Sequence, residues 1–249
     1  MPVEESADML IMTAAAVIAD NDTGFAEENS DLLKKWAGYL VKYGLDPGDQ
    51  LCTDDFAGHL AHNVNLSVKA ILGVASWSIL CRLTGKKEEA EEFMRIAREM
   101  AAVWTSRAVE GDHTRLAFDN DGSWSMKYNL VWDIIFGTDL FSGELIEKEI
   151  NGYIKLENRY GVPLDSRKSY TKSDWILWCA AMADSTENRE ALIHPVYLFL
   201  QESKSRVPFS DWYDTLSAEH IRFKNRTVQG GLFMPMLRAD GKCALKNIV

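Results

Sequence analysis

Aspartates follow short extended apolar stretches at four places in the chain, and they supply the side chains best suited to acid–base chemistry. The four strings are LCTDDF, RLAFDND, GVPLDS and RVPFSDW. Asp54, Asp55 and Asp211 from these strings are candidate catalytic residues, because a carboxylate beside a water molecule or a hydroxyl can accept its proton. Asp133 is a fourth candidate. It stands alone within YNLVWDII, where a buried acid must either face a cavity or pair with a base.

The densest polar cluster lies in the string DDFAGHLAHNVN, at the start of an apolar segment. His59 and His62 would share one face of a helix if the helix has begun there, and a metal ion would then need Asp54 or Asp55 as a third ligand. Alternatively, the two aspartates cap the helix and the imidazoles face the core. We favour a substrate-facing cluster without a metal, in which His59 and Asn63 bind the substrate.

The string DSRKSYTKSDW holds two acids, three bases and four Ser or Thr hydroxyls ahead of another apolar segment. Its simplest interpretation is a solvated loop that ends in a helix cap at Thr171 or Ser173. However, the guanidinium of Arg167 could hold an amino-acid carboxylate through two hydrogen bonds, and a helix N-terminus would add positive charge in the same direction. We therefore favour binding. The candidate substrate-binding residues from this loop and the next are Asp165, Arg167, Lys172, Asp174, Trp175, Arg206 and Trp212.

Two kinds of helical segment alternate along the chain. The first kind is apolar almost all round, and its members span 9–19, 66–83, 130–137, 175–183 and 228–237. Such helices are expected to be buried on every side. The second kind is amphipathic, and its members span 32–43, 90–104, 144–160 and 187–203. An inner ring of helices wrapped by an outer ring produces this alternation, so the sequence predicts an all-α fold, an (α/α) toroid.

Short and long connections between these segments alternate along the chain. Each connection from an apolar segment to the next amphipathic one is short. The connections that lead back to an apolar segment are long, and they span 44–61, 109–127, 161–171 and 204–226. Loops above about 12 residues are usually functional. All four should lie at the end of the toroid where the inner helices begin, and that end is the candidate active-site face.

Several strings in the chain resemble those of a known family. They are PVEESADMLIM, LCTDDFAGHLAHNVNLSVKAI, WSMKYNLVWD, GVPLDSRKSYTKSDW and SRVPFSDWYDT. Together they resemble the C-terminal six-hairpin domain of the glutaminase A family, known from fungi and gut bacteria, and the similarity runs from Pro2 to about Leu237. The resemblance implies a six-hairpin toroid of the glycosidase type, hydrolysis of L-glutamine to glutamate and ammonia, and a secreted or periplasmic protein.

The same resemblance bears on how the chain is organised. Residues 1–249 are expected to form a single toroid domain. Nine helices are three fewer than six hairpins require, so the ring is expected to be incomplete at its N-terminus and the chain to be a C-terminal part of a longer protein. In the family a β-rich domain precedes the toroid, and that missing upstream domain is an expected partner. An incomplete ring would expose apolar flanks of the first and last inner helices.

Two functions fit these residues. In an amidohydrolase, a carboxylate would activate water or a hydroxyl such as Thr53, Ser169 or Ser210, and Arg167 or Lys172 would hold the substrate or the developing oxyanion. In the alternative, a glycoside hydrolase or carbohydrate-binding domain, two carboxylates would flank a sugar about 5 to 10 Å apart. Its stacking platforms would be tryptophans 124, 132, 175 and 212. A further possibility is that this chain is inactive by itself.

Composition excludes several other classes of partner and cofactor. The net charge of -10 disfavours nucleic acid and anionic membranes, so a small molecule, an amino acid or a sugar, is the expected ligand. The sequence lacks a signal for a membrane span, a P-loop, a G-x-G-x-x-G or an H-E-x-x-H motif, and no cofactor is expected. The four cysteines, Cys52, Cys81, Cys179 and Cys243, show no C-x-x-C pair and are expected to be mostly buried thiols.

Overall fold

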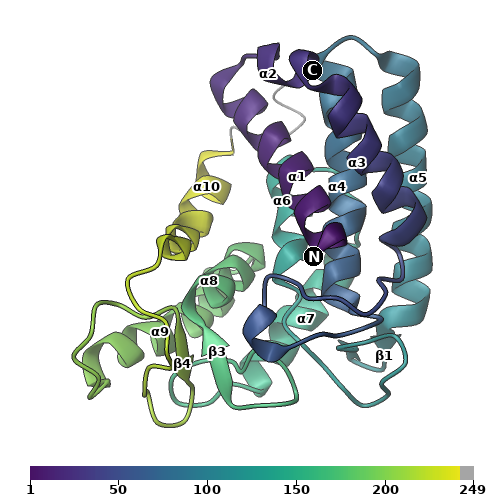
Figure 1. Ribbon diagram of the computed structural model, residues 1–249. Coiled ribbons are helices and arrows are strands. Elements are labelled where there is room, and N and C mark those ends of the chain that lie inside the picture. The colour runs from purple at the N-terminus through teal and green to yellow at the C-terminus, as the bar shows by residue number, and fades with distance from the viewer. Residues whose placement is uncertain (242–249) are drawn as a thin grey trace.

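The protein is known from a computed structural model that describes residues 1–241, and these fold into paired helices with only a few short strands (Figure 1). The inner helices are α1 (Pro2–Asp20), α4 (Val64–Leu83), α6 (Val131–Phe136), α8 (Ser173–Met182) and α10 (Met234–Asp240). The outer helices are α3 (Ser30–Tyr43), α5 (Lys87–Ala108), α7 (Gly143–Lys155) and α9 (Thr186–Glu202). The short helix α2 (Gly24–Glu28) and the 3-10 helices η1 (Asp55–Ala57), η2 (Tyr128–Leu130) and η3 (Thr227–Phe233) complete the set. The expected all-α fold and its alternation of helices are confirmed.

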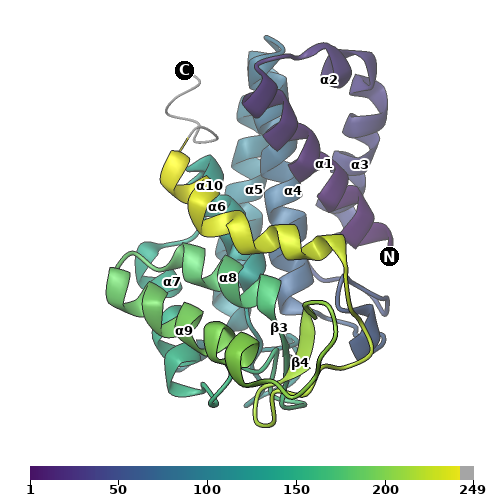
Figure 2. The same ribbon diagram turned by 90° about the vertical axis from the view of Figure 1, so that its left-hand side faces the viewer.

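The inner helices form an arc in which each packs beside the next. Helix α1 contacts α4, α4 contacts η2 at the head of α6, α6 contacts α8, and α8 contacts α10. Outer helices pair with inner ones, as α3 does with α1, α5 with α4 and α9 with α8. Figure 2 shows α10 crossing near α6 and α8, and Figure 1 shows α1 and α10 at opposite ends of the arc.

Local signals explain where several helices begin and end. Asn63 starts α4, because its side-chain oxygen accepts a hydrogen bond from the amide of Leu66 at 3.0 Å. Serines cap α7 and α9 in the same way. Helix α6 ends at Gly137, whose φ of 64° is the left-handed conformation that glycine adopts without steric cost.

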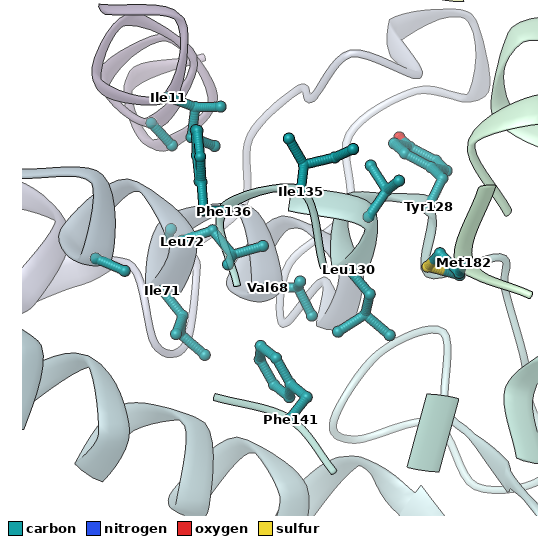
Figure 3. Close-up of a cluster of buried hydrophobic side chains, with 14 of the residues drawn as sticks. Ile11, Val68, Ile71, Leu72, Tyr128, Leu130, Ile135, Phe136, Phe141 and Met182 are labelled. Carbon is teal, nitrogen blue, oxygen red and sulfur yellow. The ribbon is translucent and has the colours of Figure 1, made fainter. Parts of the chain in front are cut away.

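The core lies where the inner helices meet, and α4 runs through its middle. Residues 64–81 of α4 are all buried. Figure 3 shows side chains of α1, α4, η2, α6 and α8 converging there, among them Ile11, Leu72, Leu130 and Phe136. Helix α4 is long and apolar enough to cross a membrane, but its whole apolar window is buried inside the protein, so here it serves as the core helix.

The expectation that every apolar helix is buried on all sides is wrong for the two ends of the arc. In α1, Met12 is 62% exposed, and at the junction of η3 and α10, Phe233 and Met236 are 64% and 66% exposed. A helix is buried all round only when it has neighbours on both sides, and α1 and α10 each have an inner neighbour on one side. Cys52, Cys81 and Cys179 are buried free thiols, whereas Cys243 lies outside the described residues.

The four long connections lie side by side at the end where α4, η2 and α8 begin, as expected. An antiparallel bridge from Asn63 to Ala117 joins the first connection to the second, and one from Ser125 to Asp165 joins the second to the third. Strand β3 (Tyr170–Lys172) pairs antiparallel with β4 (Trp212–Asp214), which joins the third to the fourth. A further hairpin, β1 (Val109–Glu110) with β2 (His113–Thr114), closes the second connection on itself. We call this surface the loop face.

Candidate functional site

Asp54 is the point where three of the long connections meet. One of its carboxylate oxygens, Oδ2, accepts a hydrogen bond from the hydroxyl of Tyr128 at 2.8 Å, and Oδ1 accepts one from Nε1 of Trp175 at 3.0 Å. The rings of Tyr128 and Trp175 are stacked with centroids 4.2 Å apart and planes within 6°. The stacked rings of Tyr128 and Trp175 restrain each other, so their two donor groups fix the orientation of the Asp54 carboxylate.

The environment of Asp54 favours its protonated form. Burial raises the pKa of this carboxyl above its usual value, and the hydrogen bond from Tyr128, the charge of Lys172 and the hydrogen bond from Trp175 only partly oppose that rise. The charge of Asp165 adds to it. The pKa of Tyr128 is raised well above its usual value by burial and by Asp54, so Tyr128 stays a hydrogen-bond donor. A buried carboxyl with a raised pKa is a candidate for proton transfer in a reaction.

A narrow cavity opens beside Asp54. Its volume of about 20 Å³ is room for one water molecule. Its polar lining comprises Asp54, Asn63, Asn65, Ser125, Asp165 and Arg167. The side-chain oxygen of Asn65 is buried and has no hydrogen-bond partner among residues 1–241. An orphaned buried acceptor at a cavity wall indicates a place where a donor, such as water or an amide nitrogen, can bind.

Arg167 is already paired with its neighbour Asp165. Its Nε donates to Oδ1 of Asp165 at 2.9 Å and its Nη2 to Oδ2 at 2.6 Å, which is the two-pronged geometry expected of a carboxylate clamp. The clamp that the sequence offered to a substrate is therefore occupied from within the chain. Among residues 1–241 the remaining nitrogen, Nη1, makes no contact of this kind, and the guanidinium is partly exposed.

A buried group of charges lies behind Trp175. The ammonium of Lys172 is 2.9 Å from Oδ2 of Asp211 and 3.3 Å from Oδ2 of Asp174, and it sits 5.1 Å from the centre of the Trp175 ring. The contact with Asp174 has ion-pair distance but lacks hydrogen-bond geometry. Burial raises the pKa of Asp174 to about 7, against the lowering effect of Lys172. A guanidinium from Arg226 also reaches Asp211, at 3.3 Å.

The segment that contains η3 covers this charged group. A methyl group added at Gly231 would lie 2.9 Å from Cβ of Asp174 and 2.9 Å from Nε1 of Trp178, so the backbone there is in close contact with α8. Lys172, Asp174 and Asp211 are each at most 2% exposed. They are thus sealed from solvent, and Lys172 lies against the ring of Trp175. Asp211 does not line the cavity beside Asp54, and its expected catalytic role stays a prediction.

Three other candidates do not reach this site. Asp133 accepts hydrogen bonds from Thr138 and from the amides of Leu140 and Phe141, so it holds the turn after α6, at the opposite end of the hairpins from the loop face. Asp55 is exposed at the start of η1. His59 is exposed and faces Asp49 at 3.5 Å. None of the three lines the cavity beside Asp54.

The condition under which His59 and His62 would share a helical face is not met. Helix α4 begins only at Val64, and His62 adopts a positive φ of 59° before it. The ring of His62 lies 2.7 Å from Asp46. Among residues 1–241, no group of three or more His, Cys, Asp or Glu side chains is placed to hold a metal.

Further candidates have structural roles of their own. Asn63 lines the cavity but caps α4, so the alternative in which the aspartate pair caps this helix is not the one observed. Neither Thr171 nor Ser173 caps α8, which has no side-chain cap. Arg206 donates to the carbonyl of Ser203 and lies in a separate hollow beside α9. Trp212 is buried in an aromatic cluster, with its ring 4.4 Å from that of Phe56.

Several residues of the site were missed in the sequence. Tyr128 lies in η2 and carries no charge that marks it, whereas Asn65 belongs to the polar cluster DDFAGHLAHNVN but was not among the expected binding residues. A second buried pair lies near Asp54: Lys69 contacts Glu4 at 2.5 Å and Asp8 at 2.9 Å, and burial raises the pKa of Glu4 to about 7. The lone lysine inside the apolar run VNLSVKAIL was the available signal for this pair.

Fold and site together define an all-α protein of paired inner and outer helices whose long connections enclose a buried acid. The sequence pattern of the glutaminase A six helical-hairpin domain matches residues 1–236, so the chain belongs to that family. It is 33% identical over 240 residues to glutaminase A of Aspergillus oryzae (strain ATCC 42149 / RIB 40), an alignment that covers 94% of this chain and 35% of that protein.

A second relative gives the same picture. A probable glutaminase of Arthroderma benhamiae (strain ATCC MYA-4681 / CBS 112371) is 30% identical over 220 residues, covering 77% of this chain and 25% of that protein. The chain thus spans about a third of the length of the first relative and a quarter of the second. Both relatives carry the word glutaminase in their names.

Proposed function

We propose that the chain is the helical domain of an amidohydrolase that converts L-glutamine to L-glutamate and ammonia. The observation that carries the proposal is Asp54, a buried carboxylate with two fixed donors, at the wall of a cavity that has room for one water molecule. The names of the relatives support the same reaction. Export from the cell and a further domain in the same protein belong to this proposal, because the family resemblance implied both.

The residues around the cavity have complementary tasks in this reaction. The ionised form of Asp54 takes a proton from the water, and the unpartnered oxygen of Asn65 accepts a hydrogen bond from the substrate's carboxamide nitrogen. The nitrogen of Arg167 that Asp165 does not engage holds the substrate's α-carboxylate.

Substrate entry requires the cavity to widen, because a volume of about 20 Å³ does not admit glutamine. Ala57, Gly58 and Leu60 of the first connection form part of the lining. Gly58 has a φ of 86°, and a methyl group added there would meet no atom within 4 Å, so this stretch has room to move. The proposal therefore includes an outward shift of residues 57–60 when glutamine binds.

A glycoside hydrolase is the alternative, and one observation favours it: Asp54 and Asp165 line the same cavity, as a pair of acids in a glycosidase would. Two observations weigh against it. Asp165 is bound to Arg167, and the rings of Trp175 and Trp212 are buried against other aromatic side chains, where they cannot stack on a sugar.

The test is ammonia release from L-glutamine by the parent chain, by Asp54→Asn and by the matched control Asp55→Asn at the exposed neighbouring position. We expect Asp54→Asn to lower kcat by at least about 100-fold and Asp55→Asn to keep the parent rate within about twofold. Circular dichroism checks that both variants are folded. A parent that releases no ammonia from glutamine would reject the proposed reaction, and equal rates for the parent and Asp54→Asn would reject the role of Asp54.

A further inference from the structure

A serine and a lysine form a close pair at the cavity wall, outside the residues assigned so far. Ser125 is buried and lines the cavity opposite the first connection. Its hydroxyl lies 2.8 Å from Nζ of Lys127, which is fully buried behind it. The Ser125 hydroxyl therefore lies between the cavity and the Lys127 amine. A nucleophile that faces the substrate and is activated by an adjacent base requires this arrangement.

The neighbours of the Lys127 amine match the hydrogen-bond needs of its neutral form. Two are backbone carbonyls that can only accept, that of Ser125 at 2.9 Å and that of Thr114 at 3.4 Å. The third is the Ser125 hydroxyl, which can donate. The charged ammonium donates to all three. A neutral amine has two N–H donors and one lone pair, so in that form the carbonyls take the donors and the lone pair can receive the hydroxyl proton.

No carboxylate among residues 1–241 lies within ion-pair distance of this amine, in contrast to Lys69 and Lys172. The acid with the largest electrostatic effect on the amine is Glu149, whose Oε2 accepts from the hydroxyl of Tyr153 at 2.6 Å. Burial consequently lowers the pKa of Lys127 to about 8, although Glu149 and Asp165 oppose the change. A substantial fraction of the amine is then neutral near pH 8, as a general base must be.

None of the hydroxyls that the sequence offered as nucleophiles, those of Thr53, Ser169 and Ser210, lines the cavity of Asp54, and the two serines are engaged elsewhere. Ser169 donates to Asp214 at 2.5 Å. Ser210 contacts the carbonyls of Trp212 at 2.9 Å and Phe223 at 2.6 Å. Of these serines, only Ser125 lines the cavity of Asp54 and has a basic nitrogen within hydrogen-bond distance.

We propose that Ser125 is the nucleophile that attacks the carboxamide and that Lys127 is its general base, so that hydrolysis passes through an acyl-enzyme. This inference rests on the proposed function and adds to it the group that first attacks the amide.

The steps balance without any further reagent. The Ser125 oxygen bonds to the carboxamide carbon while its proton moves to the Lys127 amine. The carbon–nitrogen bond then breaks, and the Lys127 proton goes to the leaving nitrogen, which departs as ammonia. Water attacks the resulting ester and gives a proton to Asp54. The ester bond breaks, that proton passes to the Ser125 oxygen, and glutamate leaves.

The experiment compares the parent chain with Ser125→Ala, Ser125→Cys and Lys127→Met. Controls are Ser166→Ala and Lys168→Met, which remove the same groups from exposed positions nearby. We expect kcat for ammonia release to fall at least about 100-fold in Ser125→Ala and Lys127→Met, to be partly kept in Ser125→Cys, and to stay within about twofold in the controls. Thermal unfolding identifies any variant that fails to fold. If Ser125→Ala is such a variant, the rate of Ser125→Cys decides whether Ser125 is the nucleophile.

A second measurement detects the intermediate directly. With glutamine and hydroxylamine together, an acyl-enzyme produces glutamyl hydroxamate, and acid-quenched parent protein carries a glutamyl group on the peptide containing Ser125. Ser125→Ala should give neither product. An active parent with an equally active Ser125→Ala variant, or a glutamyl group on another residue, overturns the inference while the proposed function stands. A parent chain that releases no ammonia from glutamine would refute both this inference and the proposed function.

Discussion

Replacing Trp175 by Phe is expected to raise the pKa of Asp54 by about one unit. The indole nitrogen of Trp175 donates to the carboxylate at 3.0 Å, and phenylalanine keeps a ring against Tyr128 but cannot donate. A hydrogen bond to a charged group contributes about 1.5–3 kcal/mol and one to a neutral group about 1 kcal/mol. The ionised form of Asp54 therefore loses about 0.5–2 kcal/mol relative to the protonated form, and 1.36 kcal/mol corresponds to one pKa unit.

The measurement is an NMR titration of the carboxyl carbons in aspartate-labelled protein, with the Asp54 signal assigned by its loss in Asp54→Asn. Trp178→Phe is the matched control, because the Trp178 nitrogen is buried in the same aromatic group but has no hydrogen-bond partner among the described residues. Trp178→Phe should leave the titration midpoint of the Asp54 carboxyl unchanged. An unchanged midpoint in Trp175→Phe, or the same shift in both variants, would refute the view that Trp175 tunes this carboxylate.

Two further predictions concern stability. A methyl group at Gly231 would meet Asp174 and Trp178 at 2.9 Å, so Gly231→Ala should lower the free energy of unfolding in urea by about 1–3 kcal/mol. A methyl group at Gly230 would have nothing within 4 Å, so the control Gly230→Ala should change that free energy by less than about 0.5 kcal/mol. Equal effects of the two substitutions would contradict the close packing of this segment. Burial alone raises the pKa of Glu157 from 4.5 to about 7, so its ionisation destabilises the fold increasingly as pH rises between these values. Glu157→Gln should leave the free energy of unfolding unchanged at pH 4 and raise it by about 1–2 kcal/mol at pH 8, a range reduced for the partial exposure of Glu157. Equal gains at both pH values would argue against burial of the ionised carboxylate as the cause.

Periodicity predicted the helices well because burial follows from composition over many residues. The alternation of apolar and amphipathic segments gave the inner and outer helices, and the unequal connections gave the loop face. The prediction was wrong about the burial of Met12 and Met236, since a helix's apolar composition does not reveal whether both of its sides have neighbours.

The site was predicted less completely, because polar residues near buried helices have competing structural roles. Asp54 reached the site, but Asn63 caps a helix and Asp133 holds a turn, and the sequence does not separate these roles. The test applied to Asp133, a lone charge in an apolar run, would also have marked Lys69 and Lys127. The pairing of Arg167 with Asp165, two residues away, depends on local backbone geometry that composition does not encode.

The hydrogen bond from Trp175 to Asp54 joins residues 121 positions apart. Contacts of such long sequence separation form only after much of the intervening chain is ordered, because the entropy of closing the loop must first be offset. Helix pairs such as α4 with α5 involve neighbours in sequence and can form early. The acid site is therefore expected to be among the last parts of the molecule to assemble during folding and among the first to come apart, so a chain with most of its helices can still lack the site.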